Sequence, residues 1–594
     1  MASGEHECDV LVVGTGASGM STAITAAAHG LDVLVVDKEP RFGGTTARSG
    51  GWLWVPGTRL AAELGIGEPP GAARTYLEHE AGSHFDPERV DAFLENGPEA
   101  IEFFTTRTCV QFDMPAVFPD YHAEAPGGTQ GGRSMVTRPF DGRELGERVK
   151  LLGLPLPELT VFGMMLGSGK EIWHFMRAFR SLESFAYVTR RIARHGLDVV
   201  RHGRGMTLTN GNALAGRLAR AAMDLEIPVW LSSPARELLT EGDAVVGARV
   251  EREGKPMRIR ARRGVVLACG GFPHDIERRK ALFRHAPTGR EHFSPSPPAN
   301  TGDGLRLAES VGAYVDTTIP NAAAWVPTSV IRRRDGTEGV MPHFIDRAKP
   351  GVIAVNRRAR RFTNEANSYH DFVQALVADS REDPEVFAWL LCDHRTLRRY
   401  GLGCVPPSPM PLGHYLRSGY LKRAATLEGL AAVIGVDPGT LRTTVDDFNR
   451  DVAGGEDSAF GRGSKAYNRY QGDAQVTPNP CLAPIETGPF YAIRLVVGDI
   501  GTFAGLVTDR YTRVIGKTGM PIPGLHAVGN DAASVMGGNY PGAGITLGPA
   551  LTFGYIAGRT LAEAGSAAAI AAASGAEATA SRPTATRAHS ATAP

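Results

Sequence analysis

Residues 8–19 have the sequence CDVLVVGTGASG, and this stretch decides the fold. Its Val-rich part, 8–13, is typical of a strand that is buried on both faces of a parallel sheet. The Ala-rich run 17–29 predicts a helix, and Gly30 follows it as a C-terminal cap. A second strand is expected over 31–37 (LDVLVVD). The three segments predict a βαβ unit with short connections, which indicates the α/β fold class.

Gly14, Gly16 and Gly19 form a Gly-x-Gly-x-x-Gly motif between the first expected strand and the helix. In that context the motif predicts a dinucleotide site. Gly14 allows the tight turn, Gly16 lets the backbone approach a pyrophosphate, and Gly19 permits close packing of helix on strand. The helix N-terminus, with Ala17 and Ser18, offers free N–H groups and a partial positive charge to phosphate.

Asp37 and Lys38 follow the second expected strand. The Asp37 carboxylate can accept hydrogen bonds from both ribose hydroxyls of an adenosine. Directly after them, RFGGTTARSGG (41–51) offers a second cradle of bare backbone with hydroxyl donors. A second phosphate contact so close to the first predicts a cofactor that continues toward an isoalloxazine ring, and hence FAD rather than NAD. The cradle residues expected to bind it are Gly43, Gly44, Thr45, Thr46, Ser49, Gly50 and Gly51.

Two segments late in the sequence complete the predicted flavin site. AVGNDAAS (527–534) carries an amide and a carboxylate that suit ribityl hydroxyls. YPGAGITLGPA (540–550) leads into an expected helix, whose first N–H groups would face the flavin N1/O2 edge. The helix dipole would stabilise the negative charge that this edge carries in reduced flavin. The residues assigned here are Asn530, Asp531, Thr546, Leu547 and, from the earlier segment ACGG (268–271), Gly270.

The pattern of segments predicts a discontinuous Rossmann-like FAD-binding domain with an inserted domain. We expect residues 1–298 and 488–564 to form the first, with a mostly helical insertion at about 60–200. Residues 299–487 mix helix and strand signals and are expected to form an α+β catalytic or capping domain. Residues 565–594 are nearly all Ala, Ser, Thr and Gly, so they cannot bury enough surface to offset their ordering entropy, and we expect disorder.

Composition narrows the function classes. The net charge of +1 gives no electrostatic footprint for nucleic acid. The six cysteines are scattered without a CxxC pair, which favours reduced thiols of a cytoplasmic protein and argues against a metal site or an internal electron relay. No stretch reaches the roughly 18 apolar residues of a membrane helix, and we expect neither a transmembrane segment nor a signal peptide. No amphipathic anchor is apparent, although an apolar substrate would allow peripheral association with a membrane.

Six segments, spread from about residue 8 to 560, resemble the flavoprotein superfamily of fumarate reductases and succinate dehydrogenases. Within it, the chain is most similar to the 3-ketosteroid dehydrogenases, the Δ1-dehydrogenases especially. The segments are FGGTTARSGG (42–51), PDYHAEAPGG with GRSM (119–135), NTGDGLRLAESVGA (300–313), RRFTNEANSYHDF (360–372), GPFYAIRL (488–495) and YPGAGITLGPALTFGY (540–555).

The resemblance implies roles for four residues. Tyr369 matches the family's general base, and Tyr121 matches the tyrosine that assists it. Tyr540 and Gly544 match the hydroxyl and the N–H that hold the 3-keto oxygen. In the implied reaction the base takes a proton from the carbon next to the ketone, charge develops on the carbonyl oxygen, and the neighbouring carbon gives a hydride to flavin N5. One oxyanion donor is worth about 3–4 kcal/mol, and a donor beside the base stabilises its phenolate.

The sequence differs from those of related families at several positions, and these differences restrict the expected cofactor attachment and substrate. The segment TTARSGG (45–51) lacks the histidine through which succinate dehydrogenases bind FAD covalently, so FAD is expected to be non-covalent. Residues 542–551 lack the arginine that dicarboxylate reductases use as a carboxylate clamp, which favours an apolar ketone. A single Trp325 stands where the Δ1-dehydrogenases often have a Trp-Trp pair, which changes the pocket. His122, beside Tyr121, is a candidate for the proton path.

The favoured function is therefore introduction of a C=C bond next to a ketone, 3-ketosteroid 1-dehydrogenation above all, with an external electron acceptor. A 3-ketosteroid 4-dehydrogenase or an enzyme for another polycyclic, terpenoid or alicyclic ketone would look similar. A fumarate-reductase-like ene reductase is the second hypothesis, because it would use the same flavin site in the other direction. The third is a flavin-binding electron-transfer module without a substrate of its own.

Overall fold

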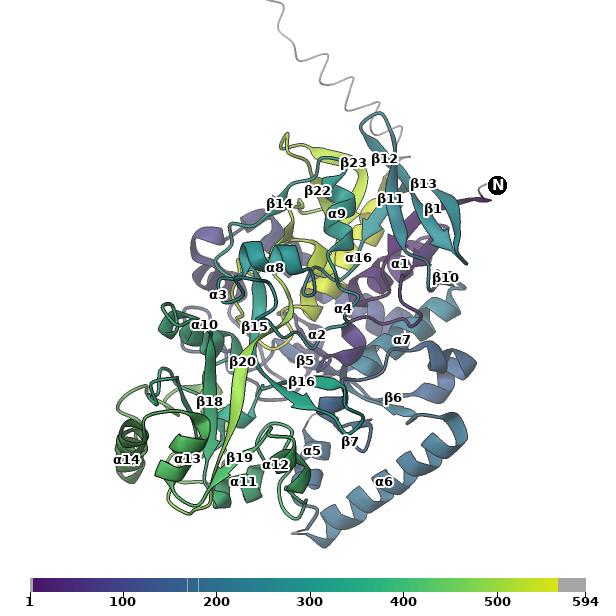
Figure 1. Ribbon diagram of the computed structural model, residues 1–594. Helices are drawn as coiled ribbons and strands as arrows, with labels where there is room; N and C mark the ends of the chain where they lie inside the picture. Colours follow the sequence, from purple (N-terminus) through teal and green to yellow (C-terminus); the bar gives the residue numbers. More distant parts are fainter. Residues whose placement is uncertain (1–3, 168, 180, 565–594) are drawn as a thin grey trace, which may run out of the picture.

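The structure is a computed structural model that describes residues 4–167, 169–179 and 181–564 (Figure 1). The expected disordered tail, residues 565–594, lies outside the described residues. Two large sheets organise the rest, which confirms the α/β class.

The first sheet has a parallel core around β1, which pairs with β2 on one side and β13 on the other. The register places Val10 opposite Val33, so the two Val-rich runs lie side by side in the buried centre. β10 and β23 extend the parallel part, and the long hairpins β11–β12–β13 are antiparallel. The strands are β1 (Gly4–Val13), β2 (Val33–Val36), β10 (Val229–Trp230), β11 (Ala235–Glu241), β12 (Ala244–Arg252), β13 (Lys255–Leu267), β22 (Arg513–Ile515) and β23 (Pro521–Ala527).

Helices α1 (Ala17–Ala28) and α16 (Leu547–Glu563) pack against each other beside this sheet, which brings two segments far apart in the sequence together. Glycines make the approach close, because a Cβ added at Gly554 would lie 2.6 Å from the Ser18 carbonyl oxygen. The Ser21 hydroxyl donates to the Leu551 carbonyl at 2.6 Å across the same contact. The N-termini of both helices therefore face the same region.

The second sheet is antiparallel, in the order β16-β15-β20-β18-β17, with β19 also paired to β20. Helix α10 (Tyr369–Asp379) packs on β15, and α13 (Leu427–Ile434) packs on β19, β20 and α14 (Pro438–Gly454). Its strands are β15 (Ala323–Arg332), β16 (Glu338–Pro342), β17 (Val352–Val355), β18 (Phe387–Cys392), β19 (Lys422–Ala424) and β20 (Phe490–Thr502).

The pairing of β20 bears on the predicted domain boundaries. The sequence places residues 488–564 with the dinucleotide domain, yet β20 hydrogen-bonds only within the second sheet among the described strands. We therefore propose that the inserted domain extends to about residue 502. The rest of the predicted division stays a prediction.

Further helices and short strand pairs surround the two sheets, and α6 runs along the lower edge of the molecule in Figure 1. Within the described residues no helix combines the length and apolarity that crossing a bilayer requires. The helices are α2 (Arg59–Glu63), α3 (Ala72–Ala81), α4 (Pro87–Arg107), α5 (Lys170–Met176), α6 (Leu182–His202), α7 (Asn210–Asp224), α8 (Ile276–Leu282), α9 (Asp303–Glu309), α11 (His394–Tyr400), α12 (Gly413–Arg417) and α15 (Ala466–Gln471). The short strands are β3 (Trp52–Trp54), β4 (Phe112–Asp113), β5 (Ser134–Thr137), β6 (Phe140–Asp141), β7 (Thr160–Val161), β8 (Met164–Met165), β9 (Thr207–Leu208), β14 (Val315–Asp316) and β21 (Gly505–Leu506).

Candidate active site

A cavity of about 450 Å³ runs past the N-termini of α1 and α16, within the size range of small-molecule and cofactor sites. Most of the residues that the sequence assigned to FAD line it. They are Gly14, Gly16, Ala17, Ser18, Asp37, Lys38, Gly44, Thr45, Thr46, Ser49, Gly270, Asn530, Thr546 and Leu547.

The cavity has the features that a dinucleotide needs. Gly16 and Gly44 face each other, since a Cβ added at Gly44 would lie 4.0 Å from the Gly16 Cα, so side chains here would narrow the cleft. Gly16 precedes α1 without a side-chain cap of its own, but the Ala17 N–H, expected to be free, donates to the Thr46 hydroxyl at 3.0 Å. The N–H groups available to phosphate therefore begin at Ser18. Thr546 likewise precedes α16 without a side-chain cap. The residues present therefore fit FAD, whose pyrophosphate would lie at the start of α1 and whose ring would lie toward α16.

Asp37 is held in place by hydrogen bonds from the backbone of its neighbours. Its Oδ2 accepts from the Thr15 backbone N–H at 2.9 Å, and its Oδ1 accepts from the Glu39 N–H at 2.9 Å. Burial raises the pKa of this carboxyl, and these hydrogen bonds oppose the rise. Lys38 lines the same end of the cavity and pairs with Asp303 of α9.

Five predicted cofactor residues are not among those that line the cavity. A Cβ at Gly19 would lie 2.1 Å from the Gly14 carbonyl oxygen, so Gly19 serves close packing as predicted. Asp531 differs from its prediction, because its oxygens accept from the N–H groups of Cys269 (2.6 Å) and Gly271 (2.9 Å) rather than pointing into the cavity toward ribityl hydroxyls. The carboxylate shapes the turn after β13. The five are Gly19, Gly43, Gly50, Gly51 and Asp531.

Three tyrosines from distant segments meet beside the N-terminus of α16. The hydroxyl of Tyr121 lies 3.1 Å from that of Tyr369, close enough to donate a hydrogen bond. The ring of Tyr540 lies 5.6 Å from the Tyr121 ring and 5.0 Å from the Tyr369 ring, measured between centroids. The structure thus brings together the three tyrosines that the sequence singled out. We call these three residues the tyrosine cluster.

Burial dominates the electrostatics of the tyrosine cluster. It raises the pKa of Tyr369 and of Tyr121 well above the usual value. The neighbouring phenols raise the pKa of Tyr369 further, whereas the hydrogen bond with Tyr369 lowers the pKa of Tyr121. Burial raises the pKa of Tyr540 to about 12, against hydrogen bonds with Tyr369 and Thr546 that lower it. A phenolate here needs a nearby donor, and Tyr121 is placed to be that donor for Tyr369.

Gly544 occupies a position that excludes a side chain. Its φ is +101°, and an added Cβ would lie 2.5 Å from the backbone of Leu53 in β3. Its carbonyl oxygen accepts from the Trp54 N–H at 3.1 Å and from the Gly548 N–H at 2.8 Å. Within the described residues its own N–H has no hydrogen-bond acceptor.

Sequence reasoning missed several residues of this site. The Tyr467 ring lies 4.4 Å from that of Tyr121, and its hydroxyl accepts from Gln471 at 2.7 Å. The Tyr76 hydroxyl donates to the Pro541 carbonyl at 2.7 Å, beside the 2.9 Å bond from the Tyr121 N–H to the same oxygen. Neither tyrosine stands in a motif, so no sequence signal marked them.

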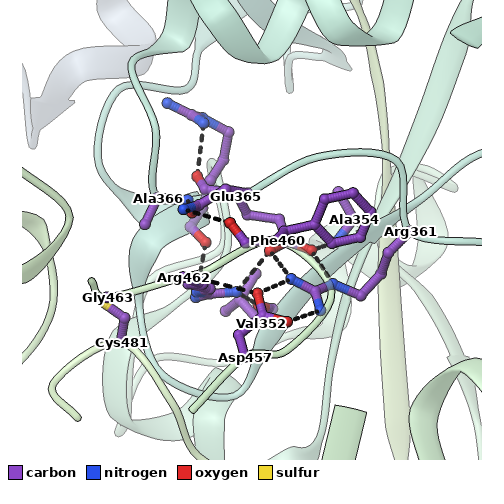
Figure 2. Close-up of polar contacts among 12 residues, drawn as sticks. Val352, Ala354, Arg361, Glu365, Ala366, Asp457, Phe460, Arg462, Gly463 and Cys481 are labelled. Carbon is purple, nitrogen blue, oxygen red and sulfur yellow. Dashed lines mark hydrogen bonds and ion pairs between the residues drawn. The ribbon is translucent and has the colours of Figure 1, made fainter. Parts of the chain in front are cut away.

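A buried ionic cluster holds the segment that leads to Tyr369, and Figure 2 shows it. Glu365 is fully buried and accepts from Arg361 at 2.8 Å and from Arg462 at 3.2 Å. Arg361 also bonds both oxygens of Asp457 at 2.8 and 2.9 Å. The Ala354 N–H of β17 donates to Glu365 as well, at 3.1 Å. The cluster therefore pins this segment to the second sheet, a few residues before α10.

Comparisons with known proteins agree with this site. Residues 9–547 match the model of a family described as the FAD binding domain. The chain is 42% identical to 4-oxocyclohex-2-ene-1-carboxylate 5-dehydrogenase of Sinomonas cyclohexanicum over 94% of each chain. It is 36% identical to 3-oxosteroid 1-dehydrogenase of Mycobacterium tuberculosis over 94% of this chain and 99% of that protein.

A solved structure gives the same result. The fold matches 3-ketosteroid Δ1-dehydrogenase from Sterolibacterium denitrificans, crystallised in complex with 1,4-androstadiene-3,17-dione, with a TM-score of 0.86. The two sequences are 36% identical, over 94% of this chain and 99% of that one. The chain therefore belongs to the FAD-binding family, as a 3-ketosteroid Δ1-dehydrogenase-like oxidoreductase that acts on CH–CH groups with FAD as its cofactor.

Proposed function

We propose that this enzyme introduces a C=C bond next to the carbonyl of a cyclic ketone, and that 3-ketosteroid 1-dehydrogenation is its reaction. The observation that carries the proposal is the arrangement of the tyrosine cluster with Gly544. The Tyr540 hydroxyl and the Gly544 N–H come from one short segment, and the hydrogen-bonded phenol pair of Tyr121 and Tyr369 packs against the Tyr540 ring.

Each side chain has a step in this reaction. Tyr369 acts as a phenolate whose oxygen accepts a hydrogen bond from the Tyr121 hydroxyl. It takes a proton from the carbon next to the carbonyl and becomes a neutral phenol. Negative charge then develops on the carbonyl oxygen, where the Tyr540 hydroxyl and the Gly544 N–H stabilise it. Bound FAD supplies the acceptor for the hydride that leaves the neighbouring carbon. The apolar burial of the site strengthens all these hydrogen bonds by excluding water.

A second candidate substrate is a small carboxylated cyclohexanone, because the relative from Sinomonas cyclohexanicum is named for such a compound. Both candidates share the ketone chemistry and differ in what surrounds the ring. Neither matches the dicarboxylate reductases, whose arginine clamp has no counterpart among residues 542–551.

The test is anaerobic mixing of the holoenzyme with one compound at a time. The panel is a 4-ene-3-ketosteroid, 4-oxocyclohexanecarboxylate and succinate. Of the three compounds, only the steroid should remove the visible absorbance of oxidised flavin. One molecule of the steroid diene should form for each flavin that is reduced. Bleaching by the cyclohexanone acid alone would select the second candidate. No bleaching by either ketone would refute the proposed reaction.

Two further parts of the proposal concern FAD and the electron acceptor. FAD is held without a covalent bond, because the 45–51 segment offers no histidine, and unfolding should release it into a filtrate. An external acceptor reoxidises the enzyme. A soluble dye should therefore restore turnover in the absence of oxygen.

We also propose that the enzyme works in the cytoplasm, with free cysteines, and that it associates peripherally with membranes. The support for the second part is α6, which sequence analysis did not identify as an anchor. Leu182 and Val200 on its outer face are 89% and 85% exposed, whereas Ser184 and Asp198 face the protein. Three arginines of α6 are also exposed, and basic residues beside exposed apolar ones are typical of helices that lie on anionic lipid. The three arginines are Arg190, Arg194 and Arg201.

Vesicle sedimentation tests this localisation. The holoenzyme should pellet with vesicles that contain anionic lipid, and the double variant Leu182→Glu/Val200→Glu should remain in the supernatant. Met520→Glu removes an apolar side chain that is 66% exposed and lies outside α6, between β22 and β23, and is the control. Equal pelleting of all three proteins would rule out α6 as the contact.

A further inference from the structure

His122 lies between two carboxylates from different helices. Its Nδ1 is 2.8 Å from Glu80 Oε2 on α3, and its Nε2 is 2.9 Å from Asp371 Oδ2 on α10. Since a carboxylate only accepts, both ring nitrogens must donate, and the ring is an imidazolium. Burial disfavours this charge, but the bonds to Asp371 and Glu80 outweigh it and raise the pKa of His122 to about 10. The contact therefore consists of two charge-assisted hydrogen bonds at neutral pH. We call His122 with Glu80 and Asp371 the His122 clip.

The clip touches all three segments that carry the tyrosine cluster. His122 directly follows Tyr121. Asp371 shares the first turn of α10 with Tyr369, where its N–H donates to the helix cap Ser368. Glu80 reaches the third segment through its backbone, because its carbonyl accepts from the side chain of Asn539, next to Tyr540.

The two neighbours of Tyr121 tie it to opposite sides of the site. Asp120 accepts from the Trp54 indole at 2.8 Å and from Arg133 at 2.7 Å, which fixes the loop to the dinucleotide side. His122 fixes it to α10. Apart from the contact between the two hydroxyls themselves, the His122–Asp371 bond is the one hydrogen bond between residues 119–123 and α10 in the described part of the chain.

We propose that His122 is a positioning residue that sets the distance between the Tyr121 and Tyr369 hydroxyls by clipping the Tyr121 loop to α10 through Asp371 and Glu80. It touches neither hydroxyl and does not carry the proton. This inference rests on the proposed function, in which the hydroxyl pair is the base and its donor. An O–H···O bond weakens steeply as it lengthens or tilts, so a small slip of the loop would remove the donor from the phenolate.

The test is a double-mutant cycle on the holoenzyme with His122→Phe and Tyr121→Phe. His122→Phe removes both donors and should lower kcat about 100-fold, the cost of a misplacement near 1 Å, with KM changed less than about threefold. In the Tyr121→Phe background there is no hydroxyl left to position. The same substitution should then cost less than about threefold, so the effects are strongly non-additive.

Two variants supply the controls. His122→Gln keeps an amide donor toward one carboxylate and should recover about tenfold of the lost kcat. His394→Phe removes a 3.1 Å contact to a tyrosine outside the cluster, Tyr491, and should leave kcat per bound flavin unchanged. FAD content and melting temperature, measured on every variant, separate a positional effect from a loss of fold.

Each contrary outcome has a distinct meaning. Equal losses from His122→Phe in both backgrounds would overturn the positioning role, because His122 would then act independently of Tyr121. A loss of FAD with unchanged kcat per flavin would also overturn it. Neither result touches the proposed reaction, which fails separately if Tyr369→Phe retains turnover.

Discussion

The dinucleotide cavity and the tyrosine cluster are built in opposite ways. The cavity wall is largely backbone: Gly14, Gly16 and Gly44 line it, and two helix N-termini open into it. The cluster consists of side chains, and its two hydroxyl partners stand 248 positions apart in the sequence. The chain can fold only if the backbone that lines the cavity adopts its native conformation. A phenol, in contrast, can lose its hydroxyl while the backbone stays where it is. Substitutions should therefore affect stability and FAD content in the first region and rate in the second.

Tyr369→Phe should have the largest effect. Loss of the base should lower kcat about 10³–10⁴-fold, while FAD content and melting temperature stay at the wild-type value, because only one hydroxyl is removed. Stopped-flow bleaching by the substrate measures the step directly. Activity within a few fold of wild type would show that Tyr369 is not the base. It would also show that the two regions do not differ in the way proposed here.

Gly14→Ala tests the opposite region. Gly14 has a φ of +119°, and its added Cβ would lie 2.1 Å from the Ala268 carbonyl oxygen. We expect a loss of about 4 kcal/mol in the free energy of unfolding, and loss of FAD. Gly30→Ala is the matched control, because that glycine has a φ of +84° with open space around it and should cost only about 1 kcal/mol. Equal denaturant midpoints for the two variants would contradict this account.

Tyr540→Phe removes one of the two proposed oxyanion donors. The rate should fall about 10²–10³-fold, since Gly544 still donates, and FAD should stay bound. Steady-state kinetics, with kcat calculated per bound flavin, measure this fall in rate. A fall no greater than threefold would show that the hydroxyl does not meet the developing charge.

Glu365→Gln sharpens the comparison, because Glu365 is buried near the tyrosine cluster but acts on stability. Removing its charge leaves Arg361 and Arg462 poorly compensated, and we expect a loss of about 3 kcal/mol in the free energy of unfolding. Glu385→Gln, in a pair that is half exposed, should cost less than about 1 kcal/mol. If the two variants unfold at the same denaturant concentration, the buried cluster does not stabilise the fold.

The smallest expected effect concerns pH and the His122 clip. Because the folded pKa of His122, about 10, lies above its unfolded value, the clip contributes its full stability below the unfolded pKa. That contribution is lost as pH rises through the folded value. The difference in melting temperature between wild type and His122→Phe should therefore shrink between about pH 7 and about pH 10. A difference that grows with pH would mean that His122 is neutral beside Glu80 and Asp371.

The sequence by itself determined the βαβ unit, the flavin cofactor and the identity of the three tyrosines. Each rests on residues close together in the chain, such as the glycines of 14–19, whose spacing alone defines a turn and a helix N-terminus. The resemblance that marked Tyr121, Tyr369 and Tyr540 likewise rests on short motifs. Local patterns of this kind can be recognised without knowledge of what packs against them.

Only the tertiary structure decided how these parts meet. It placed β20 in the second sheet and Asp531 on the backbone of 269–271, both against expectation. It also joined His122 to Glu80 and Asp371, residues that no motif connects. Such contacts depend on the packing of segments far apart in the chain, and the periodicity of one segment carries no information about which distant side chain it will face.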